Sequence, residues 1–196
     1  MERQNTEFRQ EQIKEAVLDI IYTAGLKNLS TRNLANRIGM SEGAIFRHFR
    51  TKQDIILSII KDVQTDFIGN LRKIANSSLE PSERLEKLLC STVKYLIKNK
   101  GITMLMFSEA TQKNDTELKR ILQNIFNNQK SLVSKIILDG IAIGIWNESM
   151  DVEYIAKLYM GIPVSLNIEL VLSSGIFHAD DFCKKMMKLL LKILEK

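Results

Sequence analysis

Apolar residues recur along most of the chain at the three- and four-residue spacing of an α-helix. The first such segment places six of them on one side of a helix, and they are Ile13, Ala16, Val17, Ile20, Ile21 and Ala24. Gly25 follows directly, and we expect it to end this helix in the left-handed conformation that glycine adopts without strain. The pattern therefore predicts a first helix with one buried face.

Two short apolar segments come next, and a serine precedes each of them. Ser30 and Ser41 are good N-cap residues, because a serine hydroxyl accepts a hydrogen bond from the free backbone amides of the first helical turn. We predict helices over residues 31–38 and 42–49, separated by a tight turn at Gly39. Two short capped helices joined by a glycine turn are typical of a helix–turn–helix, which would pack on the first helix.

Longer helices are predicted beyond Lys52, where the apolar residues continue at helical spacing. These helices cover residues 55–74, 85–97, 102–110, 118 to about 144, 151–172 and 182–194. Together with the first three they make about nine helices and no strand. The sequence therefore predicts an all-α protein, with a helix–turn–helix domain over residues 1–51 and a larger helical domain over residues 52–196.

Positive charge is concentrated near the N-terminus. The chain of 196 residues has 28 Lys and Arg against 23 Asp and Glu, a formal net charge of +5. Residues 1–52 hold nine of the basic and six of the acidic residues, so they alone contribute +3. This mild excess suits a polyanionic partner such as nucleic acid.

The cysteines and the first residues indicate a cytoplasmic protein. Cys90 and Cys183 have no motif spacing, so we expect neither a zinc site nor a disulfide framework, and a reducing cytoplasm fits them. The polar start of the chain lacks the apolar segment of a secretory signal.

The segment 158–179 is apolar enough to be considered as a membrane span. Its single charge, Glu169, lies near the middle, where a carboxylate costs about 2.5–3.5 kcal/mol in a bilayer. Pro163, Asn167 and His178 add a helix breaker and polar groups. We therefore expect no membrane span, and we interpret the segment as a helix that packs against other helices.

The short capped helices and their turn resemble the DNA-binding domain of TetR-family transcriptional regulators. The resemblance covers residues 13–57 in sequence detail, whereas the rest of the chain matches only in length and helical pattern. The matching features are Gly25, the runs LSTRNLA at 29–35, IGMS at 38–41 and GAIFRHF at 43–49, and Lys52. The resemblance implies a dimeric regulator that binds double-stranded DNA.

The resemblance also implies DNA contacts for particular residues. Thr31 and Lys52 would contact phosphates, and Phe46 and His48 stand where the family has a Tyr-x-His pair that binds the DNA backbone. Phe46 departs from this pattern, because it lacks the phenol hydroxyl that would bond to a phosphate. The residues that read or border bases would be Arg32, Glu42, Gly43, Ala44 and Arg47, with Ser41 beside them chiefly as a cap.

The chemistry of the second short helix agrees with these roles. Gly43 and Ala44 are small, so the backbone can approach the floor of a groove. Arg47 lies on the same face as Ala44 and can reach a guanine or a phosphate. For Glu42 the role stays open: it reads a cytosine, or it caps the helix or points to solvent.

The last two long helices are the candidates for a dimer interface. Residues 158–172 are apolar nearly all round, so a monomer could not cover them, and residues 182–194 have a strong apolar face. The resemblance implies that two copies pair these helices as a four-helix bundle. The alternative is that both helices belong to the core of a monomer. Pro163 is expected to kink its helix or to free a carbonyl, and Gly140 and Gly144 to allow close helix packing.

The family usually encloses a small-molecule effector within its C-terminal helices. Residues suited to an apolar pocket are Met104, Met106, Phe107, Phe126, Trp146 and Tyr159. The alternative for each is an ordinary place in the core. No cluster of charges fixes the chemistry of the effector, so a small lipophilic molecule is favoured, and control by a protein partner without an effector is the competing hypothesis.

Nothing in the sequence points to catalysis. It has two histidines, no glycine-rich phosphate loop and no Gly-x-Ser-x-Gly motif. His178, Asp180 and Asp181 are near one another in sequence, but two acidic residues at a helix start are explained by the helix dipole. We expect no enzyme activity, no cofactor and no metal.

Overall fold

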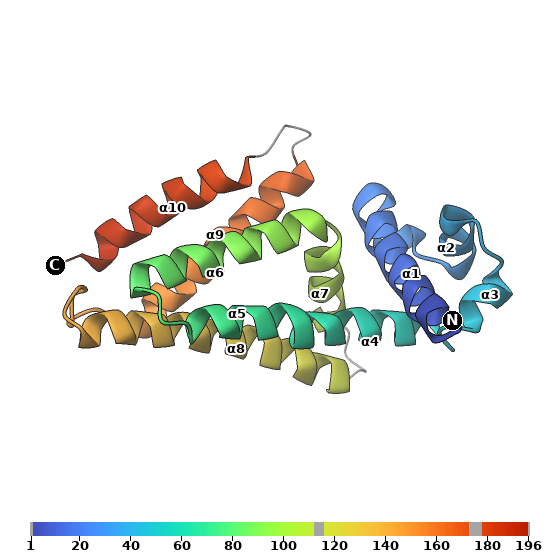
Figure 1. The fold of residues 1–196 in the computed structure, drawn as a ribbon. Coiled ribbons are helices and arrows are strands. Elements are labelled where there is room, and N and C mark those ends of the chain that lie inside the picture. Colours follow the sequence, from blue (N-terminus) through green and yellow to red (C-terminus); the bar gives the residue numbers. More distant parts are fainter. Residues whose placement is uncertain (1, 112–115, 173–177, 196) are drawn as a thin grey trace. The chain divides into compact units, whose positions relative to one another are not determined.

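The computed structural model describes residues 2–111, 116–172 and 178–195, and every regular element in these ranges is helical (Figure 1). The first half contains α1 Glu2–Ala24, a 3-10 turn Leu26–Asn28, α2 Thr31–Ile38, α3 Glu42–Phe46, α4 Lys52–Asp62 and α5 Ile68–Ala75. The second half contains α6 Pro81–Lys98, α7 Ile102–Thr111, α8 Thr116–Ala142, α9 Val152–Leu172 and α10 Ala179–Leu194. A π-helical segment, Val63–Phe67, joins α4 to α5 without a break, so the described residues form nine continuous helices, as predicted.

The chain divides into two compact units. The first gathers residues 1–63 and 99–122, and it contains α1 to α4, α7 and the beginning of α8. The second gathers residues 64–98 and 123–196, and it contains α5, α6, most of α8, α9 and α10. The helix–turn–helix segment therefore lies wholly within the first unit.

The predicted apolar face of α1 forms the core of the first unit. Ile13, Val17 and Ile21 are fully buried, and Leu34 of α2 and Ile45 of α3 are buried with them. The helix begins well before the predicted apolar segment, because the Glu, Gln and Arg residues that precede this segment are good helix formers.

Two predicted helix ends differ in detail from the structure. Gly25 has a φ of 80° and a ψ of 159°, so it follows α1 with a positive φ that favours glycine, but its ψ lies outside the left-handed helical region. Gly39 does adopt the left-handed conformation, with a φ of 65° and a ψ of 33°. The helix predicted over 42–49 ends at Phe46, because the amides of His48 and Phe49 both donate to the Ile45 carbonyl and close the segment as a turn.

Gly101 allows the start of α7 to lie directly on α1. A Cβ atom at this position would be 2.2 Å from the backbone carbonyl oxygen of Leu18. Real Cβ atoms do not approach a backbone oxygen so closely, so any larger residue would push the two helices apart.

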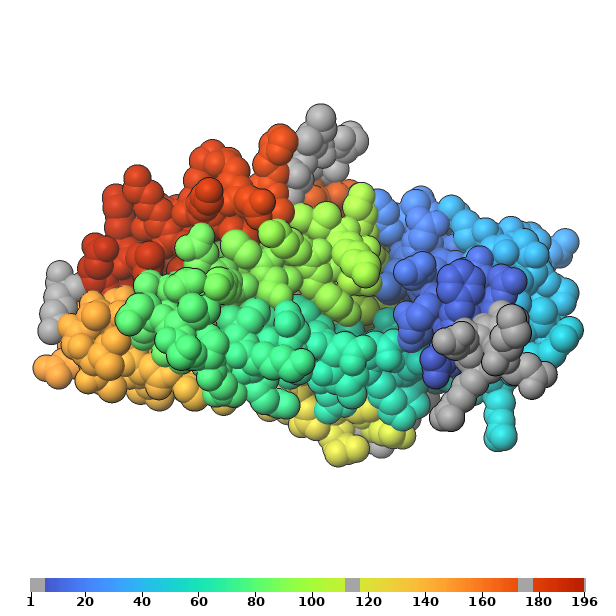
Figure 2. Space-filling model, in the orientation of Figure 1, coloured from blue at the N-terminus to red at the C-terminus, as the bar shows by residue number. Residues whose placement is uncertain are grey.

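In the second unit, α6 is the central helix, and α5, α9 and α10 pack against it. Figures 1 and 2 show α10, in red, lying along α6, in green. Leu85 and Leu89 of α6 are fully buried. Tyr159 of α9 is buried as well, and its hydroxyl donates a hydrogen bond of 2.9 Å to the Leu85 carbonyl. This bond satisfies the one polar atom of a side chain that otherwise fills the core.

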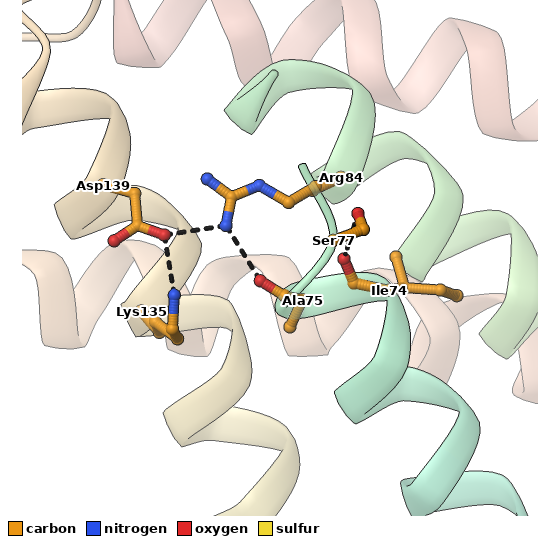
Figure 3. A network of polar contacts seen from close by, with 6 residues as sticks. All are labelled: Ile74, Ala75, Ser77, Arg84, Lys135 and Asp139. Atoms are coloured by element: carbon orange, nitrogen blue, oxygen red, sulfur yellow. Dashed lines mark hydrogen bonds and ion pairs between the residues drawn. The ribbon is translucent and has the colours of Figure 1, made fainter. Parts of the chain in front are cut away.

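A buried arginine links three parts of the second unit (Figure 3). Arg84 of α6 donates from Nη1 to the Ala75 carbonyl at 2.8 Å and to the Asp139 carboxylate at 2.7 Å. Lys135 pairs with the same carboxylate oxygen at 2.9 Å. The hydrogen bond from Lys135, burial, and the bond from Arg84 together leave the pKa of Asp139 lowered, because the two cations outweigh the effect of burial. The network therefore ties the end of α5 to α6 and α8.

The glycine pair at the end of α8 does not bring two helices together as expected. Gly140 instead leaves space for the indole of Trp146, whose ring would lie 2.2 Å from a Cβ atom at that position. Trp146 is 3% exposed, so the chain after α8 folds back and places the indole over Gly140. Gly144 has a φ of 78° and belongs to the turn between them.

The helices α9 and α10 leave large apolar side chains on the surface. They include Leu158, Ile168 and Leu172 of α9 and Leu189 and Ile193 of α10, all of which are at least 49% exposed. By length and composition α9 could cross a membrane, a test that core helices of soluble proteins also pass. It packs against α6, with Ala156, Tyr159 and Leu166 buried, so it is part of the folded unit. The helix continues through Pro163.

Candidate DNA-binding interface

Two serine caps fix the beginnings of α2 and α3, and this prediction is confirmed. Ser30 and Ser41 each accept a hydrogen bond of 3.1 Å from the backbone amide three residues later. Leu34 and Ile45 are buried, so each helix presents its opposite face to solvent. The caps determine where the helices begin, and the apolar anchors determine which side chains point outward.

The ten predicted DNA-contact residues all lie on this segment of the first unit. Thr31, Ala44 and His48 are half-buried. The other seven are exposed, and they are Arg32, Ser41, Glu42, Gly43, Phe46, Arg47 and Lys52. Phe46 is 45% exposed, so its ring is available to pack against a partner.

Gly43 is a glycine that the free protein does not require. A Cβ atom at this position would meet nothing within 4 Å, and the backbone φ is not in the positive range. Glycine is a poor helix former, so an alanine would suit the first turn of α3 better. The small residue therefore costs stability in the isolated chain and makes sense where another molecule approaches the backbone closely.

Thr31 and Glu42 are bonded to each other. The Thr31 hydroxyl donates to the Glu42 carboxylate at 2.6 Å and joins the first turns of α2 and α3. Glu42 is exposed, and in the free protein its carboxylate accepts this bond. The role of either residue toward DNA stays a prediction.

Arg47 and His48 lie in the turn that follows α3. Arg47 is exposed, and the Nδ1 atom of His48 is buried without a hydrogen-bond partner. The backbone carbonyl of His48 accepts a hydrogen bond of 3.2 Å from the side chain of Gln10 on α1. Sequence reasoning missed Gln10, because it belongs to the polar part of α1 and no periodicity marks it.

Lys52 is the first residue of α4. Thr51 and Asp54 form a capping box, in which each side chain accepts from the backbone amide of the other residue. The box fixes the beginning of α4, so the exposed lysine is held at a defined place beside the turn after α3.

A buried lysine fastens α1 to the end of α4. Lys14 is 8% exposed, pairs with Asp62 at 2.5 Å and also contacts Glu11. Burial lowers the pKa of Lys14, but the hydrogen bonds to Asp62 and Glu11 outweigh it, so the pKa is raised. The sequence analysis did not single out this residue, since a lysine beside an apolar helical stripe is ordinarily solvated.

The six residues suggested for an effector pocket fall in different settings. In the first unit, Met104 and Met106 are half-buried and Phe107 is 60% exposed. In the second, Phe126 is 51% exposed, whereas Trp146 and Tyr159 are buried by the contacts described above. Trp146 and Tyr159 thus have core roles in this state of the protein, and a ligand-binding role for all six stays a prediction.

The acidic residues near His178 have partners of their own. Asp180 pairs with Lys94 at 3.0 Å, and Asp181 pairs with Lys185 at 2.8 Å. Among the described residues no three His, Cys, Asp or Glu side chains are grouped as a metal site would need.

Comparison with known protein families decides the assignment. Residues 13–59 match the model of bacterial regulatory proteins of the tetR family, and residues 60–193 match the model of the YsiA-like protein C-terminal region. The chain belongs to the TetR family. It is a DNA-binding transcriptional regulator with the helix–turn–helix described above.

Individual relatives of this TetR-family regulator are distant. The nucleoid occlusion factor SlmA of Actinobacillus pleuropneumoniae is 22% identical over 138 residues, which are 70% of this chain and 68% of SlmA. Two solved structures share the fold. The ketosteroid transcriptional regulator KstR2 of Mycobacterium tuberculosis has a TM-score of 0.82 at 16% identity, covering 96% of this chain and 95% of that one. FadR of Bacillus subtilis, in complex with stearoyl-CoA, has a TM-score of 0.73 at 20% identity, with 92% and 97% covered.

Proposed function

We propose that this regulator is a homodimeric repressor that binds a palindromic operator and is released from it by a lipophilic effector. The observation behind the proposal is the exposed face of α3. Gly43, a glycine that the free fold does not need, lies on this face, and the exposed cations Arg47 and Lys52 follow it, in the turn after α3 and at the start of α4. A close backbone approach and nearby positive charge are what a helix needs in the major groove.

The exposed apolar residues of α9 and α10 support a dimer. One helix–turn–helix neutralises few phosphates, so it binds DNA weakly. Two of them related by a two-fold axis make twice as many contacts and bind two half-sites about 34–36 Å apart. Residues 158–172 and 182–194 supply the surface for the second copy, since seven of their large apolar side chains are exposed to solvent in the single chain. In this arrangement residues 1–51 bind DNA, and residues 52–196 bind the effector and the partner copy.

For the effector we propose an acyl thioester with a long hydrocarbon chain. The hydrocarbon chain is lipophilic, and where the thiol is coenzyme A its phosphate groups make the other end anionic. The similar fold of FadR, whose structure contains stearoyl-CoA, supports the class. The six candidate pocket residues are aromatic or sulfur-containing, and such side chains adapt to an irregular apolar ligand.

Release of the operator requires that the effector bind two states of the dimer unequally. Moving the population from 99:1 to 1:99 takes about 5.5 kcal/mol of difference in binding free energy. Equal operator affinity in the presence and absence of every bound effector would remove this mechanism.

The competing hypothesis is control by a protein partner. The similarity to the nucleoid occlusion factor SlmA is the reason to retain this hypothesis. The two hypotheses differ in what the purified protein contains. A lipophilic molecule that is extracted from the protein and weakens operator binding supports the effector. Its absence, with no response to acyl thioesters of any chain length, supports the partner.

Selection of bound duplexes from a random pool tests the DNA-binding proposal. An inverted repeat is the expected product, and a recovered site without two-fold symmetry would contradict dimeric binding. Arg47→Ala should then weaken operator binding and relax the preference at one base pair, by about 1–3 kcal/mol. Lys52→Ala, its matched control, should weaken all duplexes alike and reduce the salt slope by about one unit.

A further inference from the structure

Two thiols from distant parts of the sequence meet in the second unit. Cys90 lies on α6 and Cys183 on α10, both are free thiols, and they are near enough for each side chain to affect the pKa of the other. Cys183 is completely buried, whereas Cys90 is half-buried. Spacing in the sequence gives no sign of this pair.

The packing of the two helices explains the contact. Figure 1 shows α6 and α10 running side by side in opposite directions, and Figure 2 shows them adjacent at the surface. Lys94 and Asp180 form an ion pair of 3.0 Å across the same seam. Lys94 comes one turn after Cys90, and Asp180 comes about one turn before Cys183. The antiparallel register that joins the charged pair therefore also sets the two thiols opposite each other.

We propose that Cys90 and Cys183 are a redox-active pair that forms a reversible disulfide when the protein meets a hydroperoxide. In the first step the Cys90 thiolate attacks one peroxide oxygen, and the O–O bond breaks. The products are a sulfenic acid on Cys90 and an alcohol or water, which takes up the thiol proton. In the second step the Cys183 sulfur attacks the Cys90 sulfur, the S–O bond breaks, and water leaves with the second proton. Two thiols thus supply the two electrons that reduce one peroxide.

The surroundings of the two cysteines decide which thiol attacks the peroxide and which one then closes the disulfide. Burial raises the pKa of Cys183 to about 12, so this residue stays protonated and inaccessible. Burial also raises the pKa of Cys90, and contact with Cys183 and the charge of Lys94 oppose this effect only in part. The charges of Glu86 and Asp180 raise this pKa further. Cys90 is the attacking thiol because it is the half-buried one of the two, and the completely buried Cys183 is the resolving thiol. Because the pKa of Cys90 is raised, its thiolate is scarce at neutral pH, and the reaction rate should rise with pH.

The bond would fasten α10 to α6 within one chain. Cys183 lies with Met187, Leu190 and Leu194 on the buried face of α10, whereas Leu189 and Ile193, which belong to the surface proposed for the second copy, are exposed. The inference does not depend on the proposed function, because it concerns two residues outside the DNA-binding segment.

The test treats full-length reduced protein with cumene hydroperoxide at neutral and mildly alkaline pH. Free thiols are titrated after denaturation, and peptides are mapped by mass spectrometry without reductant. We expect both thiols to disappear together, a peptide pair linked through Cys90 and Cys183, and full recovery with dithiothreitol. Persistence of both thiols, or links formed only between chains, would overturn the proposal.

Single-cysteine variants separate the two roles. Cys183→Ala should accumulate a sulfenic acid on Cys90 that dimedone traps, whereas Cys90→Ala should leave Cys183 unmodified. Circular dichroism checks that each variant is folded, and the peptide map of the unaltered protein needs no variant at all. Equal trapping on both cysteines would refute the assigned order.

Discussion

The hydroxyl of Thr31 donates its hydrogen to the carboxylate of Glu42 across 2.6 Å. A phosphate oxygen accepts hydrogen bonds but cannot donate them. Thr31 can therefore donate to a DNA phosphate only after its hydrogen leaves Glu42. The negative charge of Glu42 therefore lies beside Thr31, a predicted phosphate contact. The Glu42 carboxylate and a DNA phosphate would compete for the hydrogen of the Thr31 hydroxyl.

Glu42→Gln tests the balance between these two roles. The amide oxygen of glutamine can still accept from Thr31, but the negative charge is gone. We expect affinity for duplexes of any sequence to rise about two- to fivefold, the equivalent of ~0.5–1 kcal/mol for one exposed charge interaction. Fluorescence anisotropy with operator and scrambled duplexes measures it. A loss of affinity confined to one base pair would show instead that Glu42 reads a base.

Gly43→Ala should separate stability from DNA binding. The new methyl group meets no atom of the free protein, so unfolding in urea should require up to about 1 kcal/mol more free energy. Operator affinity should fall at least tenfold, because the methyl group occupies the space that the DNA needs. Unchanged affinity in the anisotropy assay would place the groove contact elsewhere on the segment.

Phe46→Tyr restores the hydroxyl that the family uses at this position. The ring is 45% exposed, so the added hydroxyl reaches solvent or DNA without disturbing the core. A new hydrogen bond to a phosphate should strengthen binding by about 0.5–1.5 kcal/mol, with little change between sequences. Phe8→Tyr is the matched control, since Phe8 is also exposed, at 65%, and lies outside the segment. Equal effects of the two variants would argue against the phosphate contact.

Gly101→Ala should destabilise the protein, because the methyl group would collide with the Leu18 carbonyl. Relief requires the two helices to separate, at a cost of about 1–3 kcal/mol in the free energy of unfolding. Gly69→Ala is the control, because Gly69 lies in α5 and a Cβ atom there would meet nothing within 4 Å. We expect the control to be neutral or stabilising in urea unfolding. An unchanged free energy of unfolding for Gly101→Ala would contradict the prediction, because the two helices would then separate without loss of stability.

Asp139→Asn should destabilise the second unit and change its response to acid. Arg84 is 6% exposed and would lose its negative partner, so we expect a loss of about 1–3 kcal/mol near neutral pH, moderated by the partial exposure of Asp139. Lys135→Ala, which removes only the exposed cation, should cost less than about 0.5 kcal/mol.

The pH dependence follows from the lowered pKa of Asp139. A carboxyl group whose pKa is lower in the folded state stabilises the fold above its unfolded pKa, and this contribution is lost as the pH falls through the folded pKa. The difference in stability between the unaltered protein and Asp139→Asn should therefore shrink as the pH is lowered through the acidic range. A difference that stays constant down to the acid transition would exclude this ion pair as its source.

Local features of the sequence were enough to predict the helical class, the serine caps and the helix–turn–helix. Helical periodicity and capping depend on residues three or four positions apart, so a single chain displays them directly. The same reasoning predicted α3 over 42–49 and missed its end at Phe46, because two amides that share one carbonyl leave no mark on periodicity. It also overlooked the unusual length of α1, whose first residues carry no apolar stripe.

The tertiary structure alone decided which distant residues meet. The bond between Gln10 and the His48 carbonyl, the pairing of Lys14 with Asp62 and the contact of Cys90 with Cys183 each join positions far apart in the sequence. Gly101 and Gly140 looked alike as glycines, yet one accommodates a backbone carbonyl and the other an indole ring. The physical reason is that side-chain periodicity fixes which face of a helix is buried, whereas the partner and the register of that face depend on how all the helices pack at once.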